Sequence, residues 1–350
     1  MEEDFFLGKT IVVSGGAGFV GSNLVKKLSL QNPARIFVVD NLLSSEEINI
    51  KGIPKVEFIR SSIANDDVLE QIYKVRPEYI FHLATYHGNQ SSIHDPIADH
   101  DNNLITSIKL FDKFKNDSNL KKIVYSAAGC AVAEKSVTTA EATVEDDHVS
   151  LVMDSPYSIS KIVGEFYAVY YHKQHKLPTV RARFQNVYGP GEILGAGEWR
   201  GTPATVWRNV TPTFIYKAIK GMSLQLENAG SGSRDFIFVD DIARGLMACA
   251  AKGQPGDVYN LASGRETTIR ELAELIMKIT GSQSKLEILP KRDWDTSIKR
   301  FGSTAKAQEK IGFEAVIQIE EGLRRTVEWT TENLPLIESC ILKHQDKLMV

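Results

Sequence analysis

The stretch "SGGAGFVGSN", residues 14–23, decides the fold. Three of its four glycines, Gly15, Gly18 and Gly21, form a spaced pattern just after the apolar run "TIVV" at residues 10–13. A strand, a glycine-rich turn and a helix start bring free backbone N–H groups and the positive helix end together, and that geometry binds phosphate. Gly15 permits the tight turn, Gly18 lets a pyrophosphate approach the backbone, and Gly21 lets the helix pack on the strand.

An acidic residue at the end of the next strand indicates which phosphate compound is bound. The run "VVDN" places Asp40 19 residues after Gly21. A carboxylate there accepts hydrogen bonds from a ribose 2′-hydroxyl and repels a 2′-phosphate. A P-loop would need Gly-Lys-Ser/Thr at its end, and "GFVGSN" lacks it. We therefore expect NAD, in preference to NADP.

Composition bounds the class of protein. The 350 residues are 43% hydrophobic and 24% charged with a net charge of −3, as in an ordinary globular protein of about two domains. There is no Lys/Arg-rich run and no apolar stretch of 18 residues, so neither a nucleic acid nor a membrane is an expected partner. The three cysteines are far apart and form no CxxC, and the acidic N-terminus does not resemble a secretory signal. We expect a cytoplasmic protein without a structural metal.

Strand and helix patterns alternate along the first half of the chain. Short β-branched runs such as "RIFVV", "YIFHLA" and "TVRARF" are separated by helical patterns up to about residue 186. Continuous apolar strands between helices predict a parallel sheet covered on both faces. The chain then becomes loop-rich, and residues 234–241 and 257–263 look like returning strands. The predicted fold is α/β, a Rossmann-like doubly wound parallel sheet with a smaller α/β C-terminal substrate lobe. The sheet domain is expected over 1–186 with 233–262, and the substrate lobe over 187–232 and 263–350.

A tyrosine and a lysine follow at helical spacing. The run "DSPYSISK" places Tyr157 and Lys161 four residues apart, on one face of a helix. An ammonium beside a phenol favours the phenolate, which can remove a proton from a sugar hydroxyl while hydride leaves the same carbon. The spacing is common by chance, and it gains meaning from the dinucleotide turn upstream.

Together these motifs make the chain resemble the extended short-chain dehydrogenase/reductases, the family of nucleotide-sugar epimerases and dehydratases. The resemblance covers nearly the whole chain and rests on motifs in a fixed order: "SGGAGFVG", "VVDN", "HLA" at 82–84, "DNNLITS" at 101–107, "SPYSISK", "RFQNVYGP" at 183–190, "VTPTFI" at 210–215, "RDFIFVDD" at 234–241 and "YNLASG" at 259–264.

The resemblance assigns site residues by position. It implies that NAD is bound by Gly15, Gly18, Phe19, Val20, Gly21, Asp40, Asn41, Ser62, Ile63, Leu83, Ala84, Thr85, Asn103, Tyr157 and Lys161. A nucleoside-diphosphate sugar would be bound by His87, Asn186, Asn209, Val210, Arg234 and Arg292. The two arginines would lie near the diphosphate, because a guanidinium meets phosphate oxygens in pairs. His87 has a second interpretation, a loop histidine packed against backbone.

The chain departs from the family pattern at the end of one strand. Family members usually carry a Ser/Thr where this chain has Ala128 in "YSAAGCAVAEK". Ser126, Cys130 or Thr85 are candidate substitutes, and we include Ser126 and Cys130 among the catalytic residues. A register shifted by two would instead make Ser126 the family hydroxyl. Ser62 is a second departure, since the family usually has Asp there.

The same strand end constrains the reaction. Family dehydratases place an acidic residue just after the Ser/Thr, and this chain has Gly129 and Cys130 there. Water elimination then has no evident acid or base, so a dehydratase is disfavoured. We expect an NAD-dependent enzyme that oxidises a ring hydroxyl, at carbon 4, of a nucleotide sugar, with epimerisation as the net outcome. Net dehydrogenation is the alternative, and an NAD-binding regulatory protein is the alternative that is not an enzyme.

Two further groups of residues remain to be interpreted. "HDPIADHD", at 94–101, gathers histidines and aspartates but matches no metal-ligand spacing. Trp199, Arg200, Trp207 and Arg208 are either core and surface residues or a cover over a bulky or charged sugar. Finally, apolar helices at "KIVGEFYAVYYHK" and "NNLITSIKLFDKF" predict a homodimer, because a monomer would expose their faces.

Overall fold

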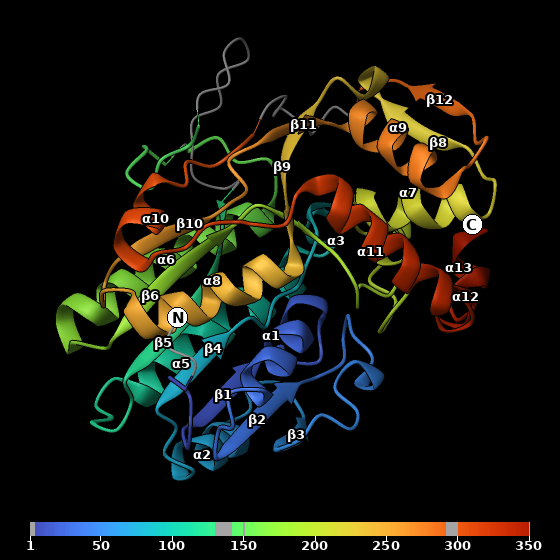
Figure 1. Cartoon of the computed structure of the whole chain (residues 1–350). Helices are drawn as coiled ribbons and strands as arrows, with labels where there is room; N and C mark the ends of the chain where they lie inside the picture. The colour runs from blue at the N-terminus through green and yellow to red at the C-terminus, as the bar shows by residue number, and fades with distance from the viewer. Residues whose placement is uncertain (1–3, 130–141, 150, 292–299, 350) are drawn as a thin grey trace.

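The computed structural model describes residues 4–129, 142–149, 151–291 and 300–349. Figure 1 shows two lobes: a larger one built on a sheet, and a smaller one of helices and short strands that includes the C-terminus.

The larger lobe is built on a seven-stranded sheet in the order β10-β6-β5-β4-β1-β2-β3. All neighbouring strands run parallel. The strands are β1 (Thr10–Ser14), β2 (Arg35–Asp40), β3 (Val56–Arg60), β4 (Tyr79–His82), β5 (Lys122–Ala128), β6 (Thr179–Phe184) and β10 (Val258–Leu261). The order reverses beside β1, so β1 and β4 form the switch point at whose carboxyl edge ligands bind in such sheets.

Helices cover both faces of this sheet. One face carries α1 (Phe19–Ser29), α8 (Val239–Lys252) and α10 (Ala305–Ile311), and the other carries α2 (Asp66–Lys74), α5 (Thr106–Phe114) and α6 (Pro156–His175). Alternate residues of β1 enter the two cores, since Ile11 and Val13 pack under α1 while Val12 packs on the α5 side. The short helices α3 (Asn89–His94) and α4 (Pro96–His100) and a π-helical turn (Asp101–Ile105) lead into α5.

The smaller lobe has its own core. It contains the parallel pair β8 (Leu224–Glu227) and β12 (Leu286–Leu289), and the helices α7 (Val210–Ile219), α9 (Ile269–Thr280), α11 (Ile319–Glu332), α12 (Leu334–Leu342) and α13 (Gln345–Leu348). Three 3₁₀ turns, at Glu47–Asn49, Pro203–Thr205 and Asn228–Gly230, complete the described elements. A three-stranded sheet of β7 (Asn186–Tyr188), β9 (Ser233–Phe238) and β11 (Glu266–Thr268) lies where the lobes meet.

Of the two strands predicted to return to the large sheet, one joins it and the other belongs to a different sheet. β10 joins it beside β6, whereas β9 pairs with β7 and β11 in the three-stranded sheet. β9 carries Asp235, which is buried and accepts hydrogen bonds from the backbone N–H groups of Ser263 and Gly264 at 2.9 and 3.0 Å. These hydrogen bonds tie β9 to the segment that follows β10, and β9 lies where the two lobes meet.

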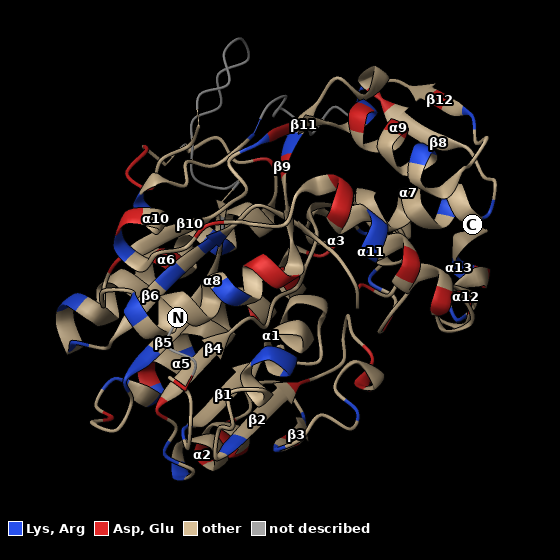
Figure 2. Ribbon diagram, in the orientation of Figure 1, with Lys and Arg blue, Asp and Glu red and all other residues tan. Residues whose placement is uncertain are grey.

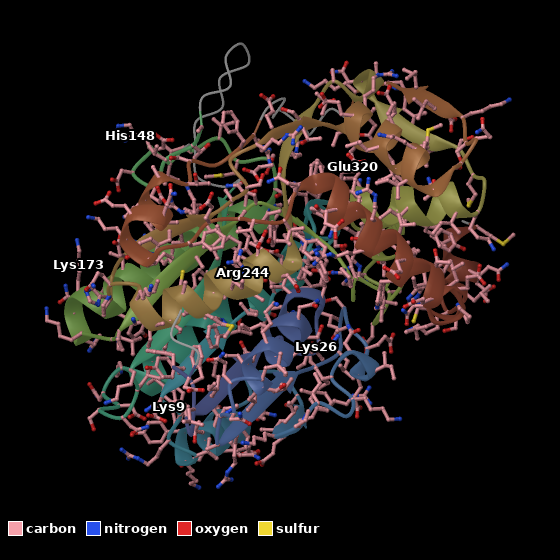
Figure 3. All side chains as sticks on the ribbon, in the orientation of Figure 1. Lys9, Lys26, His148, Lys173, Arg244 and Glu320 are labelled. Atoms are coloured by element: carbon pink, nitrogen blue, oxygen red, sulfur yellow. The ribbon has the colours of Figure 1, made fainter. Side chains whose placement is uncertain are left out.

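Side-chain interactions stabilise the helices α9 and α11. Thr268 and Glu271 form a reciprocal capping box at the start of α9. In α11, Arg324 and Arg325 pair with Glu320 and Glu321 one turn earlier, and Figure 2 shows acidic and basic residues interspersed over the helices in this view. Charged side chains such as Lys173 extend outward from the helices in Figure 3. Among the described residues, no helix combines the length and the apolar character needed to cross a membrane.

Candidate active site

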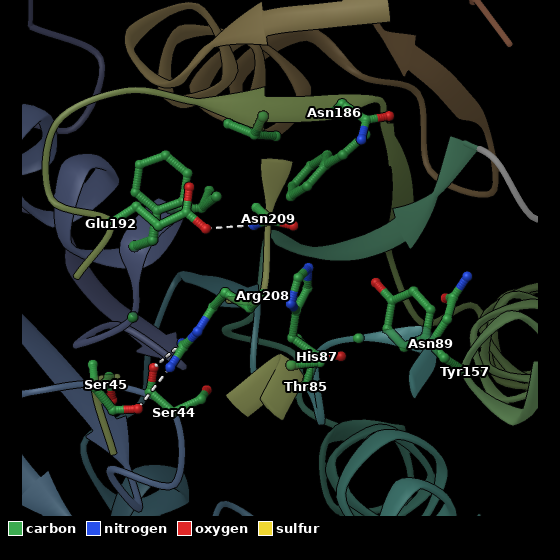
Figure 4. Close-up of a pocket in the computed structure, with 18 of the residues that line it drawn as sticks. Ser44, Ser45, Thr85, His87, Asn89, Tyr157, Asn186, Glu192, Arg208 and Asn209 are labelled. Atoms are coloured by element: carbon green, nitrogen blue, oxygen red, sulfur yellow. Dashed lines mark hydrogen bonds between the residues drawn. The ribbon is translucent and has the colours of Figure 1, made fainter. Parts of the chain in front are cut away.

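A cavity of about 720 Å³ lies at the carboxyl edge of the large sheet and extends to the smaller lobe. Figure 4 shows side chains from both lobes facing this space. Its wall includes most of the residues predicted from the sequence: Gly15, Gly18, Phe19, Val20, Gly21, Asp40, Asn41, Ser62, Ile63, Leu83, Ala84, Thr85, His87, Ser126, Tyr157, Lys161, Asn186, Asn209, Val210 and Arg234.

The glycine turn packs so closely that side chains would not fit. Gly15 has a φ of +73°, and a Cβ there would lie 2.6 Å from the backbone nitrogen of Ala84. A Cβ on Gly21 would collide with the carbonyl oxygen of Gly15. The turn therefore brings backbone directly to the start of α1, as a pyrophosphate cradle requires.

The carboxylate of Asp40 lies at the end of β2 beside this turn. It accepts hydrogen bonds from the backbone N–H groups of Ala17 (3.0 Å) and Leu42 (2.9 Å) and from the Ser45 hydroxyl (3.0 Å). Burial raises the pKa of Asp40, and these hydrogen bonds oppose the rise. Because it also lines the cavity, the carboxylate is positioned to accept a ribose hydroxyl. The turn and this carboxylate fit a dinucleotide without a 2′-phosphate.

Tyr157 and Lys161 lie in the first turns of α6, whose N-terminus is capped by Ser155. The Ser92 hydroxyl of α3 accepts the backbone N–H of Tyr157 at 3.2 Å, which fixes the first turn. The Lys161 ammonium donates to the Ser126 carbonyl oxygen at 3.0 Å and lies 3.4 Å from its hydroxyl oxygen. Burial lowers the pKa of Lys161 to about 8, although the charges of Asp99 and Glu165 partly offset this.

His87 enters the cavity from the loop after β4. Its ring meets the Tyr157 ring edge to face, with 6.0 Å between the ring centres. The backbone oxygen of His87 accepts a hydrogen bond from the Arg200 guanidinium at 2.8 Å. Arg200 itself is buried and lies over the Tyr86 ring.

The opposite wall comes from the loop after β7 and the start of α7. The Asn209 amide donates to one carboxylate oxygen of Glu192, as the dashed line in Figure 4 shows. Burial raises the pKa of Glu192 to about 7. Arg208 donates to the carbonyl oxygens of Ser44 (2.7 Å) and Ala196 (2.6 Å), which ties the loop to the segment after β2.

One described residue of the predicted site, Asn103, is not in this wall. Asn103 lies one layer behind it, where its amide oxygen accepts from the Thr85 hydroxyl (2.8 Å) and the Tyr86 N–H (2.6 Å). It therefore holds the lining loop and does not face the cavity. Cys130 and Arg292 lie outside the described residues.

The sequence interpretation missed several residues of the cavity wall. They include Asn89, Glu192, Thr213, Glu227, Lys291 and Arg300. Arg300 pairs at 2.7 Å with Asp154, just before α6. Of the four residues weighed in the inserted loop, Trp207 and Arg208 line the cavity, whereas Trp199 packs against His344. Among the described residues, no group of three metal-ligating side chains comes together.

The switch-point cavity, the glycine cradle and the tyrosine–lysine helix define a dinucleotide-dependent α/β enzyme. Residues 11–262 match the profile described as the NAD dependent epimerase/dehydratase family. The chain belongs to this family.

Relatives and solved structures agree with this assignment. A putative UDP-glucose 4-epimerase of Methanocaldococcus jannaschii is 30% identical over 92% of this chain and 99% of its own length. The Bordetella bronchiseptica enzyme WbmF, solved with NAD⁺ and UDP, is 59% identical, with a TM-score of 0.89 and 98% of each chain covered. The Thermotoga maritima UDP-glucose 4-epimerase, solved with UDP-glucose, is 32% identical, with a TM-score of 0.83 over 93% of this chain and 99% of that one. The predictions of a Rossmann-like fold, of NAD as cofactor and of an NAD-dependent nucleotide-sugar epimerase are confirmed.

Proposed function

We propose that this enzyme interconverts the carbon-4 epimers of a UDP-activated sugar, by transient oxidation of the 4-hydroxyl group. One observation carries the proposal: a single cavity is lined by Tyr157 and Lys161 of the larger lobe, by Asn209 of the smaller lobe, and by Arg234 of the junction strand β9. The uridine nucleotide is suggested by the solved relatives, which contain UDP or UDP-glucose.

Different side chains of the cavity have different roles in this reaction. Tyr157 takes the proton from the sugar hydroxyl and later returns it, and the nearby ammonium of Lys161 favours the phenolate. Bound NAD supplies the hydride acceptor and donor. Arg234 and Arg300 provide positive charge for the diphosphate, and Asn186 and Asn209 provide amide groups for the sugar and nucleotide.

We assign the cofactor to the predicted lining residues of the larger lobe, from Gly15 to Thr85, together with Tyr157 and Lys161. Asn103 supports their loop from behind. We assign NAD to 1–186 with 233–262 and the sugar to 187–232 with 263–350, with β9 at the junction between the lobes and α10 packed on the large sheet.

The direct test incubates the purified protein with UDP-glucose, UDP-N-acetylglucosamine and UDP-glucuronate, and follows the 4-epimers by proton NMR. The Tyr157→Phe variant is the matched control. We expect one substrate to equilibrate with its 4-epimer without lasting accumulation of reduced nicotinamide. Stoichiometric accumulation would instead establish a net dehydrogenase, and NAD binding without any sugar chemistry would establish a regulatory protein.

We further propose a cytoplasmic homodimer. The large apolar side chains exposed on α3, α4 and α6 are Ile93, Ile97, Ile159, Phe166 and Tyr170. These helices contact one another, so the side chains belong to neighbouring surfaces. The second predicted helix contributes less, because Leu110, Phe111 and Phe114 of α5 are buried in the protein's own core. Cys249 and Cys340 are buried free thiols, which suits a reducing compartment.

A further inference from the structure

His87 is the histidine that the cavity wall contains, and its ring lies against the proposed proton-transfer residue. The ring centres of His87 and Tyr157 are 6.0 Å apart and the ring planes are inclined by 70°. Figure 4 shows the Tyr157 hydroxyl directed into the cavity on the side of the His87 ring. A sugar hydroxyl that reaches Tyr157 must therefore pass close to the imidazole.

The backbone of His87 is fixed, while its ring nitrogens are left for a ligand. Arg200 holds the His87 carbonyl oxygen at 2.8 Å, and Arg200 is itself buried over Tyr86. Within the part of the chain that the structure describes, no protein group forms a hydrogen bond with either ring nitrogen of His87. Neither ring nitrogen is among the described buried polar atoms that lack a partner, so both nitrogens are accessible and can form a hydrogen bond with a molecule in the cavity.

The imidazole is neutral under cellular conditions. Burial, followed by the charges of Arg200, Arg208 and Lys161, lowers the pKa of His87 to about 3. A neutral imidazole has one N–H donor and one acceptor nitrogen. Such a ring can polarise a carbonyl oxygen in an enzyme site without bringing a positive charge.

Oxidation at carbon 4 creates a need for such a donor. As the proton leaves the hydroxyl and the carbon becomes a ketone, negative charge develops on oxygen in the transition state. A fixed donor at that oxygen is among the strongest contributions a site can make. Ser126, near the end of strand β5, also has a hydroxyl group, and its oxygen lies 3.4 Å from the Lys161 ammonium.

We propose that His87 is a further catalytic residue, whose ring N–H donates a hydrogen bond to the sugar oxygen that Tyr157 deprotonates. No bond to His87 forms or breaks, since the proton moves between the sugar oxygen and Tyr157. The inference rests on the proposed function, because it assumes that the reacting sugar carbon lies beside Tyr157.

The test replaces the ring in three ways. His87→Phe keeps a ring against Tyr157 but loses both nitrogens, His87→Asn retains an amide N–H near the position of Nδ1, and His87→Gln retains one near Nε2. His175→Phe, at the other end of α6, is the matched control, because His175 packs on Tyr171 outside the cavity. For each variant we would measure bound NAD, kcat and KM for the UDP-sugar that the wild type converts, and the affinity for UDP alone.

We expect His87→Phe to lower kcat by roughly a hundredfold, the scale for removing one fixed donor to a developing oxyanion. Bound NAD and UDP affinity should stay within about twofold, since neither involves the ring N–H. In one of the two amide variants, kcat should be at least tenfold higher than in His87→Phe. That variant would identify the ring nitrogen that donates the hydrogen bond. If His87→Phe keeps the wild-type kcat, or if all three variants are equally slow, the ring N–H is not the donor.

The two proposals fail separately. Wild-type protein that epimerises no UDP-sugar overturns the proposed function. His87 can then still be tested in the same variants. The protein is mixed with a nucleoside-diphosphate sugar, and the absorbance of the nicotinamide measures its reduction in a single turnover. A wild type that epimerises normally beside an equally active His87→Phe overturns only the role of His87.

Discussion

The ammonium of Lys161 donates to the carbonyl oxygen of Ser126 at 3.0 Å, joining helix α6 to the end of strand β5. Both residues are buried, so this contact fixes helix α6 against the sheet at the edge of the cavity. It also keeps a titratable amine away from water.

The burial of Lys161 makes stability depend on pH. Its pKa is about 8 in the folded protein, against 10.5 for an unperturbed lysine, so between these pH values the unfolded chain binds more protons than the folded one. The contribution of Lys161 to stability should therefore rise with pH over this window, and the cost of charging this lysine is fully present below pH 8. In Lys161→Met that rise should be absent.

Unfolding of both proteins in urea at pH 8 and at pH 10.5 measures this dependence. The difference in unfolding free energy between variant and wild type should shrink by on the order of 3 kcal/mol across the window. Comparing the same pair at two pH values cancels the change in packing. A difference that does not vary with pH would mean that Lys161 is not buried as described.

Tyr157→Phe removes one oxygen from the cavity and little else. We expect bound NAD and thermal stability to be retained while turnover falls by roughly a hundredfold or more, the scale for a positioned acid/base. The assay is epimer formation with the natural UDP-sugar. Full turnover in this variant would remove Tyr157 from the mechanism.

Asp40 should decide cofactor choice. Asp40→Ala removes the acceptor for the ribose hydroxyl and the negative charge that repels a 2′-phosphate. We expect NAD affinity to fall by about tenfold or more, the scale for a hydrogen bond to a charged group, and the preference over NADP to narrow. Asp40→Asn is the control, since it retains one acceptor oxygen for Ala17 or Ser45 and loses the charge together with the second acceptor. Titration of each protein with NAD and with NADP measures this preference. An unchanged ratio of the two affinities in Asp40→Ala would contradict the assignment.

The large lobe could be predicted because its signals are local. Apolar strands followed by helical patterns recur along the chain, and the turn at Gly15 and Gly21 indicates its own geometry. The placement of β9 could not be read this way, because the partners that satisfy Asp235 lie in separate segments at Ser263 and Gly264.

The far wall of the cavity escaped sequence reasoning for a related reason. Glu192 pairs with Asn209 across a loop that has no periodicity, and Arg300 pairs with Asp154 across 146 positions. Arg200 contacts His87 across 113 positions. Only folding brings such residues together, so their types gave no signal on their own.

The exposed face of α6 predicts a dimer. Phe166 is 56% exposed and lies one turn before Tyr170 on the same helix face. Phe166→Glu places a charge where a partner subunit would bury an apolar ring, so it should convert a dimer into a monomer in light scattering. Lys173→Glu, exposed near the end of the same helix, is the charge-changing control. A wild-type monomer at micromolar concentration would contradict the prediction.

The last prediction concerns the hydroxyl that the family resemblance expects at position 128. If His87 supplies the donor, Ser126→Ala should cost less than about 1 kcal/mol in activation free energy, because only a neutral hydrogen bond is lost. Ala128→Ser should then leave turnover unchanged or raise it, and it should restore part of the rate lost in His87→Phe. If the register is shifted by two instead, Ser126 is itself the family hydroxyl. In that case Ser126→Ala should be severely impaired, and Ala128→Ser should rescue nothing. Single-turnover reduction of the nicotinamide in the two single variants and in the double variant separates these cases. Equal rates in Ser126→Ala, Ala128→Ser and the wild type, with no rescue in the double variant, would place the reacting sugar carbon away from this strand end.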